Sequence, residues 1–167
     1  MLLYHGSNLV VEQPRPVEQS RGLDFGPGFY LTSREQQAVR FSEIVADRRR
    51  SGAPTVSVYE FDAETAEMSM EIRRFPEANK EWLRFVAANR TRSYQGAVHD
   101  IIVGPVANDA VMPTVQAFLS GLISEDATIV ALMTSKLFDQ WCLKSERALS
   151  LLHFVASRET ERGRTHG

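Results

Sequence analysis

Cysteine is almost absent from this chain of 167 residues, in which Cys142 stands alone. No disulfide can therefore form within the chain, and this fits a protein of the reducing cytoplasm. Long apolar runs are also missing, because no stretch approaches the roughly 20 residues that a membrane-spanning helix needs. The first five residues, Met1 to His5, have neither the basic start nor the apolar run of a secretory signal. We therefore expect a cytoplasmic protein with no membrane partner.

An excess of charge of either sign is lacking too. The chain has 19 Lys and Arg against 21 Asp and Glu, for a net charge of −2, so no bulk attraction to nucleic acids or anionic membranes is expected. Internal repeats and coiled-coil heptads are absent from the sequence. The length suggests one domain with enough volume for a core. We assign this domain to residues 1–156 and expect the charged, glycine-containing residues 157–167 to be a disordered tail.

What is present is a mixed order of helical and strand patterns. Helices are expected at residues 33–50, 77–90, 108–119 and 124–133. Strands are expected at residues 2–4, 29–32, 55–61, 98–103, 138–144 and 151–155. Ser33 and Gln36 have the spacing of a capping box, whereas residues 62–74 are either a short helix or an irregular connection. The spacing is too irregular for a doubly wound parallel sheet, and the pattern favours an α+β fold with antiparallel pairing.

A glycine turn at residues 22–28 precedes the strand with the most aromatic residues. Gly26 and Gly28 flank Pro27, which fixes φ and has no N–H donor, while glycine permits unusual backbone angles or the close approach of a ligand. A tight turn that leads into an aromatic strand is suited to form one wall of a pocket. The alternative is an ordinary loop before an ordinary strand, because a single glycine-rich turn is a weak signal.

Three polar residues lie in strands that are otherwise suited to a core: His5, Tyr30 and Gln140. If their strands meet in one sheet, the three side chains can converge on a cleft. Each also has a simpler interpretation. A histidine at the end of a strand is often a surface or hydrogen-bonded residue, a tyrosine can be buried with its hydroxyl satisfied, and Gln140 can face solvent because Asp139 and Trp141 take the opposite face.

The boxes around these residues resemble the signature strands of the diphtheria-toxin-like ADP-ribosyltransferases, the branch that includes the poly-ADP-ribose polymerases and has a His–Tyr–Glu triad. The boxes are Tyr4-His5-Gly6-Ser7, Phe25-Gly26-Pro27-Gly28-Phe29-Tyr30-Leu31-Thr32 and Gln140-Trp141-Cys142-Leu143. Over nearly all its length the chain is similar to a bacterial family of small uncharacterised proteins in this branch. That family shares the glycine box, an Ile-Val-Gly-Pro-Val-Ala-Asn-Asp box (102–109 here) and an Asp-Gln box, and its genes often lie beside small antitoxin-like neighbours.

The resemblance implies a split, mostly antiparallel sheet with flanking helices, and NAD as the substrate, without a metal. His5 would bind the adenosine ribose, Gly6 would offer its backbone to the nicotinamide amide, and Tyr30 and Phe41 would stack on the nicotinamide ring. Gln140 falls where the family places its catalytic glutamate. We expect NAD to contact His5, Gly6, Tyr30 and Phe41 and, in addition, Ser7, Arg21, Phe25, Gly28 and Thr32. Arg21 is placed to reach the pyrophosphate, or is a solvated loop arginine.

Two departures from the family pattern affect the expected chemistry. Ala38 matches the family's serine that bonds the nicotinamide amide, and Gln140 replaces a carboxylate. A glutamine can accept a hydrogen bond from the ribose 2′-OH, but it brings no charge and cannot act as a general base. Asp139 and Glu146 are the carboxylates that lie nearest in sequence, and strand alternation turns Asp139 away from Gln140.

The sequence therefore predicts an enzyme that transfers a single ADP-ribose from NAD to a macromolecular acceptor. Chain elongation is not expected, because Gln140 cannot act as a general base. A bacterial toxin of a toxin–antitoxin or defence system, with a cognate antitoxin as a partner, fits this prediction. Two alternatives stay open. One is an NAD glycohydrolase that uses water as the acceptor, and the other is an inactive NAD-binding or protein-interaction module, which the changes at Ala38 and Gln140 would allow.

Overall fold

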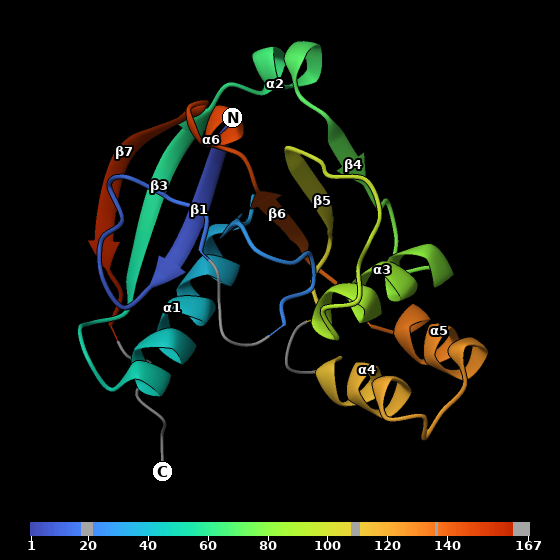
Figure 1. Ribbon diagram of the computed structural model, residues 1–167. Coiled ribbons are helices and arrows are strands. Elements are labelled where there is room, and N and C mark those ends of the chain that lie inside the picture. The colour runs from blue at the N-terminus through green and yellow to red at the C-terminus, as the bar shows by residue number, and fades with distance from the viewer. Residues whose placement is uncertain (18–21, 108–110, 136, 162–167) are drawn as a thin grey trace.

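Two sheets organise the chain in the computed structural model, which describes residues 1–17, 22–107, 111–135 and 137–161 (Figure 1). The first sheet is antiparallel, in the order β1-β3-β7, and consists of Leu2–Ser7 (β1), Thr55–Phe61 (β3) and Leu152–Glu159 (β7). The second has the order β2-β6-β5-β4 and consists of Phe29–Leu31 (β2), Asp139–Leu143 (β6), Ile101–Pro105 (β5) and Ile72–Arg74 (β4). Only β4 and β5 are parallel, so the predicted α+β class with mostly antiparallel pairing is confirmed.

The two sheets meet at one bridge between β1 and the end of β2. Tyr4 and Thr32 exchange both backbone hydrogen bonds, with N···O distances of 2.9 and 3.0 Å. On either side of this pair the strands follow separate sheets, because β1 continues with β3 and β2 continues with β6. The sheet is therefore split next to His5 and Tyr30.

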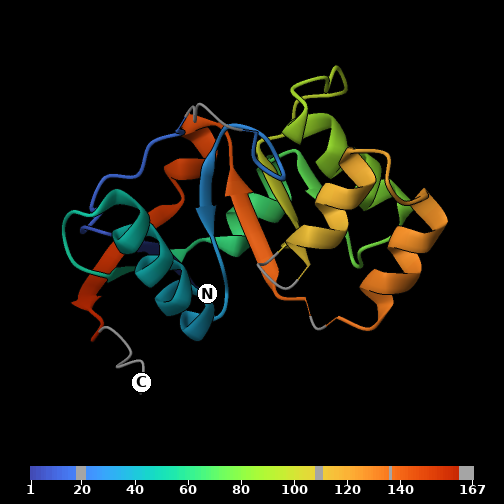
Figure 2. The same cartoon turned by 90° about the horizontal axis from the view of Figure 1, so that it is seen from below.

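Helices cover the outer faces of both sheets, as Figures 1 and 2 show. Helix α1 packs on β1 and β3, whereas α3, α4 and α5 group together beside the second sheet. The helices are Glu35–Arg49 (α1), Ala63–Ser69 (α2), Lys80–Arg90 (α3), Met112–Leu119 (α4), Glu125–Met133 (α5) and Glu146–Leu149 (α6). In the part of the chain that the structure describes, none of these helices is long and apolar enough to cross a bilayer.

Three apolar clusters hold these layers together. The first lies between the sheets and includes Leu3, Phe29, Tyr59, Phe61, Ile101 and Leu143. The second packs the other face of the second sheet against its helices and includes Phe25, Trp82, Leu83, Ile102 and Cys142. The third, smaller cluster of Ala38, Val56 and Val58 lies under α1. Alternation along β3 explains how one strand supplies two clusters, since Val56 and Val58 face opposite to Tyr59 and Phe61.

The start of α1 differs from the predicted capping box. The helix begins at Glu35, and its N-cap Arg34 makes no capping bond through its side chain. Thr32 Oγ1 instead accepts from the Arg34 N–H at 3.1 Å, and the Ser33 N–H donates to Asp139 at 3.1 Å. A carboxylate from β6, distant in sequence, therefore takes the role that the local pattern gave to Gln36. By contrast, Ser124 caps α5 as predicted and accepts from the Ala127 N–H.

The tail prediction is wrong for residues 157–159. Strand β7 continues to Glu159, and its last residues pair with the start of β3, Ser157 with Ser57 and Glu159 with Thr55. Thr160 then donates its N–H to the Pro54 carbonyl at 2.8 Å. The open edge of β3 offers backbone partners that satisfy this charged, polar segment. Residues 162–167 lie outside the described part of the chain.

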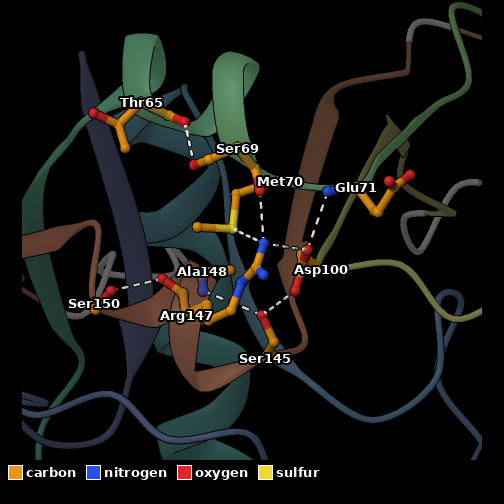
Figure 3. Close-up of polar contacts among 9 residues, drawn as sticks. All are labelled: Thr65, Ser69, Met70, Glu71, Asp100, Ser145, Arg147, Ala148 and Ser150. Atoms are coloured by element: carbon orange, nitrogen blue, oxygen red, sulfur yellow. Dashed lines mark hydrogen bonds and ion pairs between the residues drawn. The ribbon is translucent and has the colours of Figure 1, made fainter.

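A polar network fixes the junction of β5, β6 and α6 (Figure 3). Asp100 accepts from Ser145 Oγ at 2.5 Å and from the Glu71 N–H at 3.0 Å, and its carboxylate also pairs with Arg147 at 3.4 Å. The Ser145 hydrogen bond is the main reason why the pKa of Asp100 lies below its usual range. Arg147 donates in addition to the Ser69 carbonyl at 2.6 Å. The network thus joins α2 and α6 to the start of β5.

Candidate functional site

His5 lies at the split and is bonded to the backbone of β2. Its Nδ1 is 2.7 Å from the Tyr30 carbonyl oxygen. A carbonyl oxygen can only accept, so Nδ1 carries the proton and Nε2 keeps a free lone pair. The ring stacks on Phe29 with centroids 4.4 Å apart. Burial lowers the pKa of His5 to about 4, so the imidazole is neutral at pH 7 and presents Nε2 as an acceptor.

The Tyr30 hydroxyl is satisfied inside the protein. It donates to the Gly26 carbonyl at 2.5 Å and accepts from the Phe25 N–H at 3.1 Å. Burial raises the pKa of this phenol well above its usual range, so it is a neutral donor at any physiological pH. The structure shows a half-buried tyrosine whose hydroxyl is hydrogen-bonded within the protein. This bond holds the glycine turn against β2.

Gln140 shares a face of the second sheet with Tyr30. Tyr30 pairs with Cys142 across β2 and β6, and residues two apart on a strand point to the same side. The Gln140 carbonyl oxygen, Oε1, is buried and has no hydrogen-bond partner among the described residues. A buried acceptor without a donor costs about 1–3 kcal/mol. Gln140 is therefore the predicted site residue whose hydrogen-bonding capacity the protein itself leaves open.

Asp139 points away from Gln140, as alternation predicts. Its carboxylate accepts from Trp141 Nε1 at 2.8 Å and lies 3.3 Å from Thr32 Oγ1. These bonds tie β6 to the segment between β2 and α1. Glu146, the other carboxylate considered from the sequence, lies in α6 beyond the far end of β6.

Lys144, just beyond the end of β6, holds the glycine turn, a role that the sequence does not predict. Its ammonium donates to the Phe25 carbonyl at 2.6 Å and to the Pro27 carbonyl at 2.7 Å. Burial lowers the pKa of Lys144. Next to it, a Cβ at Gly28 would lie 2.4 Å from Cys142 Sγ, so only glycine fits there. A lysine at the end of a predicted strand carries no local signal of this role.

A buried ion pair anchors the start of the turn. Arg90 Nε donates to Asp24 at 2.7 Å, and the second Asp24 oxygen accepts from the Ala107 N–H at 3.1 Å. Burial raises the pKa of Asp24, and the Arg90 guanidinium opposes that shift. Gly22 packs so closely on the Arg90 carbonyl that a Cβ would lie 2.1 Å from its oxygen. The turn is thus fastened to the end of α3 as well as to β6.

Gly6 packs against α1, and Phe41 is part of that helix. A Cβ at Gly6 would lie 2.1 Å from the Ala38 carbonyl oxygen, so the close approach at Gly6 is made by α1. Ala38 is itself buried in the cluster under that helix. Phe41 keeps 44% of its surface exposed and so has a face available to a ligand.

The remaining predicted NAD contacts have mainly packing roles in this structure. Phe25 is fully buried and packs against Phe75 and Phe85, which leaves no surface for a ligand in this conformation. Ser7 and Thr32 are buried as well, and Thr32 Oγ1 caps the N–H that precedes α1. Arg21 lies outside the described residues.

Comparison with known proteins shows that the chain belongs to the family DUF3990, described as a protein of unknown function, whose model matches residues 1–154. No curated protein and no solved structure matches the chain. The family covers both sheets and nearly all of the described chain, and its description names no activity.

Proposed function

We propose that this protein is an NAD-dependent mono-ADP-ribosyltransferase, which breaks the nicotinamide–ribose bond and transfers ADP-ribose to a macromolecule. The observation that carries the proposal is the buried, unpartnered Oε1 of Gln140, on the same face of the sheet as Tyr30. A ligand hydroxyl would satisfy this acceptor. In the family that the His-Gly-Ser and glycine boxes resemble, the residue at this position binds the ribose 2′-OH.

His5 supplies a second acceptor suited to a sugar. Its Nδ1 proton is committed to the Tyr30 carbonyl, so the neutral Nε2 can accept from a hydroxyl of the adenosine ribose. Because the leaving nicotinamide is a neutral pyridine, bond cleavage needs no general acid. The ribose carbon becomes cationic, the acceptor attacks it, and the acceptor's proton goes to solvent or to a base on the acceptor side. The products are nicotinamide, ADP-ribosylated acceptor and one proton.

The amide side chain of Gln140 lowers the rate of the proposed transfer and restricts its product to a single ADP-ribose. A glutamate would stabilise the ribose cation by its charge and could deprotonate a weak nucleophile, whereas Gln140 offers a neutral bond that is roughly half as strong. We therefore propose a single transfer to an acceptor that is already nucleophilic. The physiological setting that we propose is a cytoplasmic bacterial toxin of a toxin–antitoxin or defence system.

Labelled NAD incubated with cell lysate and the purified protein tests the activity directly, with protein, RNA and DNA recovered separately. Label in one macromolecular fraction, attached as a single ADP-ribose, is the expected result. Free ADP-ribose without labelled macromolecules would identify a glycohydrolase instead. Binding of NAD without turnover would identify an inactive module, and long polymers would contradict the proposed single transfer.

A variant series at Gln140 tests the role of the amide oxygen. Gln140→Ala removes the acceptor and should lower turnover about 5- to 10-fold, the value of one neutral hydrogen bond. Gln140→Glu adds the charge and should raise turnover by about tenfold or more. Gln95→Glu makes the same chemical change at an exposed loop residue and should leave turnover unchanged. Equal rates for all four proteins would remove Gln140 from the reaction.

A further inference from the structure

A cleft of about 440 Å³ opens where β6 begins, at the end of the second sheet. Residues Asp139 and Trp141 of β6 line it, on the face of the strand opposite Gln140. Phe75 and Phe138 line it from neighbouring connections, and Arg34 does so from the segment before α1. His5, Tyr30 and Gln140 are not among its lining residues. The cleft is therefore distinct from the site proposed for NAD.

Three of the twelve residues that line this cleft are aromatic. The Trp141 ring is held in place by its Nε1–H bond to Asp139 and by an edge-to-face contact with Phe61, whose ring centroid is 5.6 Å away. Phe138 supplies a second ring, whereas Phe75 is 4% exposed and packs against Phe25 and Phe85. Small-ligand sites of this volume are mostly apolar with a few placed polar groups. These walls suit a flat ring that can stack or pack edge-on.

Arg34 is the cation that this cleft offers to a ligand. Its guanidinium lies 5.3 Å from the centroid of the Phe138 ring, and among the described residues no carboxylate pairs with it. Asp139, the nearby acid, already accepts from Trp141 and from the Ser33 N–H. A planar guanidinium held on a ring is well suited to bind phosphate by two parallel hydrogen bonds.

We propose that this cleft binds a nucleoside monophosphate, which combines a planar aromatic ring with an anionic group. The base packs on Trp141 and its neighbours, and the phosphate pairs with Arg34. A free nucleotide and a nucleotide within a single strand share this chemistry. The inference does not rest on the proposed transferase activity, because the cleft and Gln140 lie on opposite faces of β6.

Titration with UMP in the absence of NAD tests the cleft, because UMP contains neither adenine nor nicotinamide. Trp141 and the fully buried Trp82 are the two tryptophans, so a saturable change in emission that disappears in Trp141→Phe reports on the cleft. Arg34→Gln should weaken binding about tenfold, as expected for a charge-assisted pair. The matched change Arg40→Gln, at an exposed position of α1 outside the cleft, should have no effect.

Two comparisons distinguish a free nucleotide from a nucleotide strand as the ligand, and the cleft from the site proposed for NAD. Uridine without phosphate should bind at least tenfold more weakly than UMP, and an oligouridylate that binds more tightly per site than UMP would identify a strand as the ligand. His5→Asn should leave UMP binding unchanged even if it abolishes NAD turnover. The absence of a saturable change with UMP, or equal affinities for the wild type and Arg34→Gln, would overturn the proposal.

Discussion

At the residue scale, the three polar residues in apolar strands differ in whether the protein supplies their hydrogen-bond partners. His5 uses Nδ1 to bond β2, and Tyr30 uses its hydroxyl to bond the glycine turn, so each has a structural partner. Gln140 Oε1 has none among the described residues. Buried polar atoms are nearly always paired in native proteins, and Gln140 Oε1 and His99 Nδ1 are the two exceptions among the side chains that the structure describes.

The buried state of His5 predicts a pH-dependent stability. Its pKa is about 4 in the folded protein against 6.5 for an exposed histidine, so the unfolded chain takes up a proton first as the pH falls. The free energy of unfolding should therefore decrease between pH 6.5 and 4, by at most about 3 kcal/mol, and by less because part of the ring reaches solvent. Urea denaturation at pH 7 and pH 5 measures this change.

His5→Asn is the reference for that measurement, since an asparagine amide can donate to the Tyr30 carbonyl without titrating. The variant should lose less stability than the wild type between pH 7 and pH 5. The native carboxylates with lowered pKa values, such as Asp100, act mainly below this range and are common to both proteins. Parallel pH profiles for the two proteins would show that His5 is not buried as a neutral group.

At the scale of elements, β6 is the strand that organises the site. Its side chains alternate between the two faces of the sheet. Gln140 and Cys142 lie on the same face as Tyr30, and Asp139 and Trp141 line the cleft on the opposite face. Just beyond its end, Lys144 holds the glycine turn. The short strand β2 depends on these contacts, since three residues provide few hydrogen bonds of their own.

Lys144→Met should loosen the glycine turn. The change leaves the Phe25 and Pro27 carbonyls without their charged donor, which should lower the free energy of unfolding by about 1–3 kcal/mol. Amide hydrogen exchange at Phe25 and Gly26 should accelerate in step. Lys80→Met removes a lysine whose ion pair with Asp126 is at the surface, and should cost about 0.5 kcal/mol or less. Equal losses in the two variants would refute the proposed role of Lys144.

At the scale of the whole molecule there are two sheets, each with its own helices, and in the described part of the chain one bridge joins them (Figure 2). His5 belongs to one sheet, and Tyr30 and Gln140 belong to the other. His5 stacks on Phe29, on the side of the first cluster, whereas Tyr30 and Gln140 lie on the side of Cys142 and the second cluster. A ligand that contacts all three would have to reach both faces of the second sheet at the seam between the sheets.

Induced expression in bacteria tests the activity of the intact protein. The wild type should arrest growth, and His5→Ala or Tyr30→Ala should restore it, because each removes a group from the seam. His153→Ala changes an exposed histidine on β7 and should remain toxic. Circular dichroism of the purified variants separates loss of fold from loss of function. Toxicity that persists in a folded His5→Ala protein would contradict the role of His5.

The sequence was most informative where local signals act alone. The alternation in residues 55–61 predicted β3 with its bounds, and Ser124 predicted the start of α5. It failed where a distant partner replaced the local one. In place of the predicted Ser33 cap, the Ser33 N–H donates to Asp139. Residues 157–159 belong to the sheet because they pair with the open edge of β3. Neither the long-range partner nor the free edge is visible in a short window of sequence.

The residue pattern was sufficient to predict the α+β class, because period and polarity are properties of neighbouring residues. The choice of His5, Tyr30 and Gln140 rested on the resemblance to the ADP-ribosyltransferases. The tertiary structure decided the rest. The position of Tyr30 opposite Cys142 and the hydrogen bond from Lys144 to the Phe25 carbonyl depend on segments more than 100 residues apart in the chain lying side by side. Contacts of that kind arise only when the sheet has closed around them.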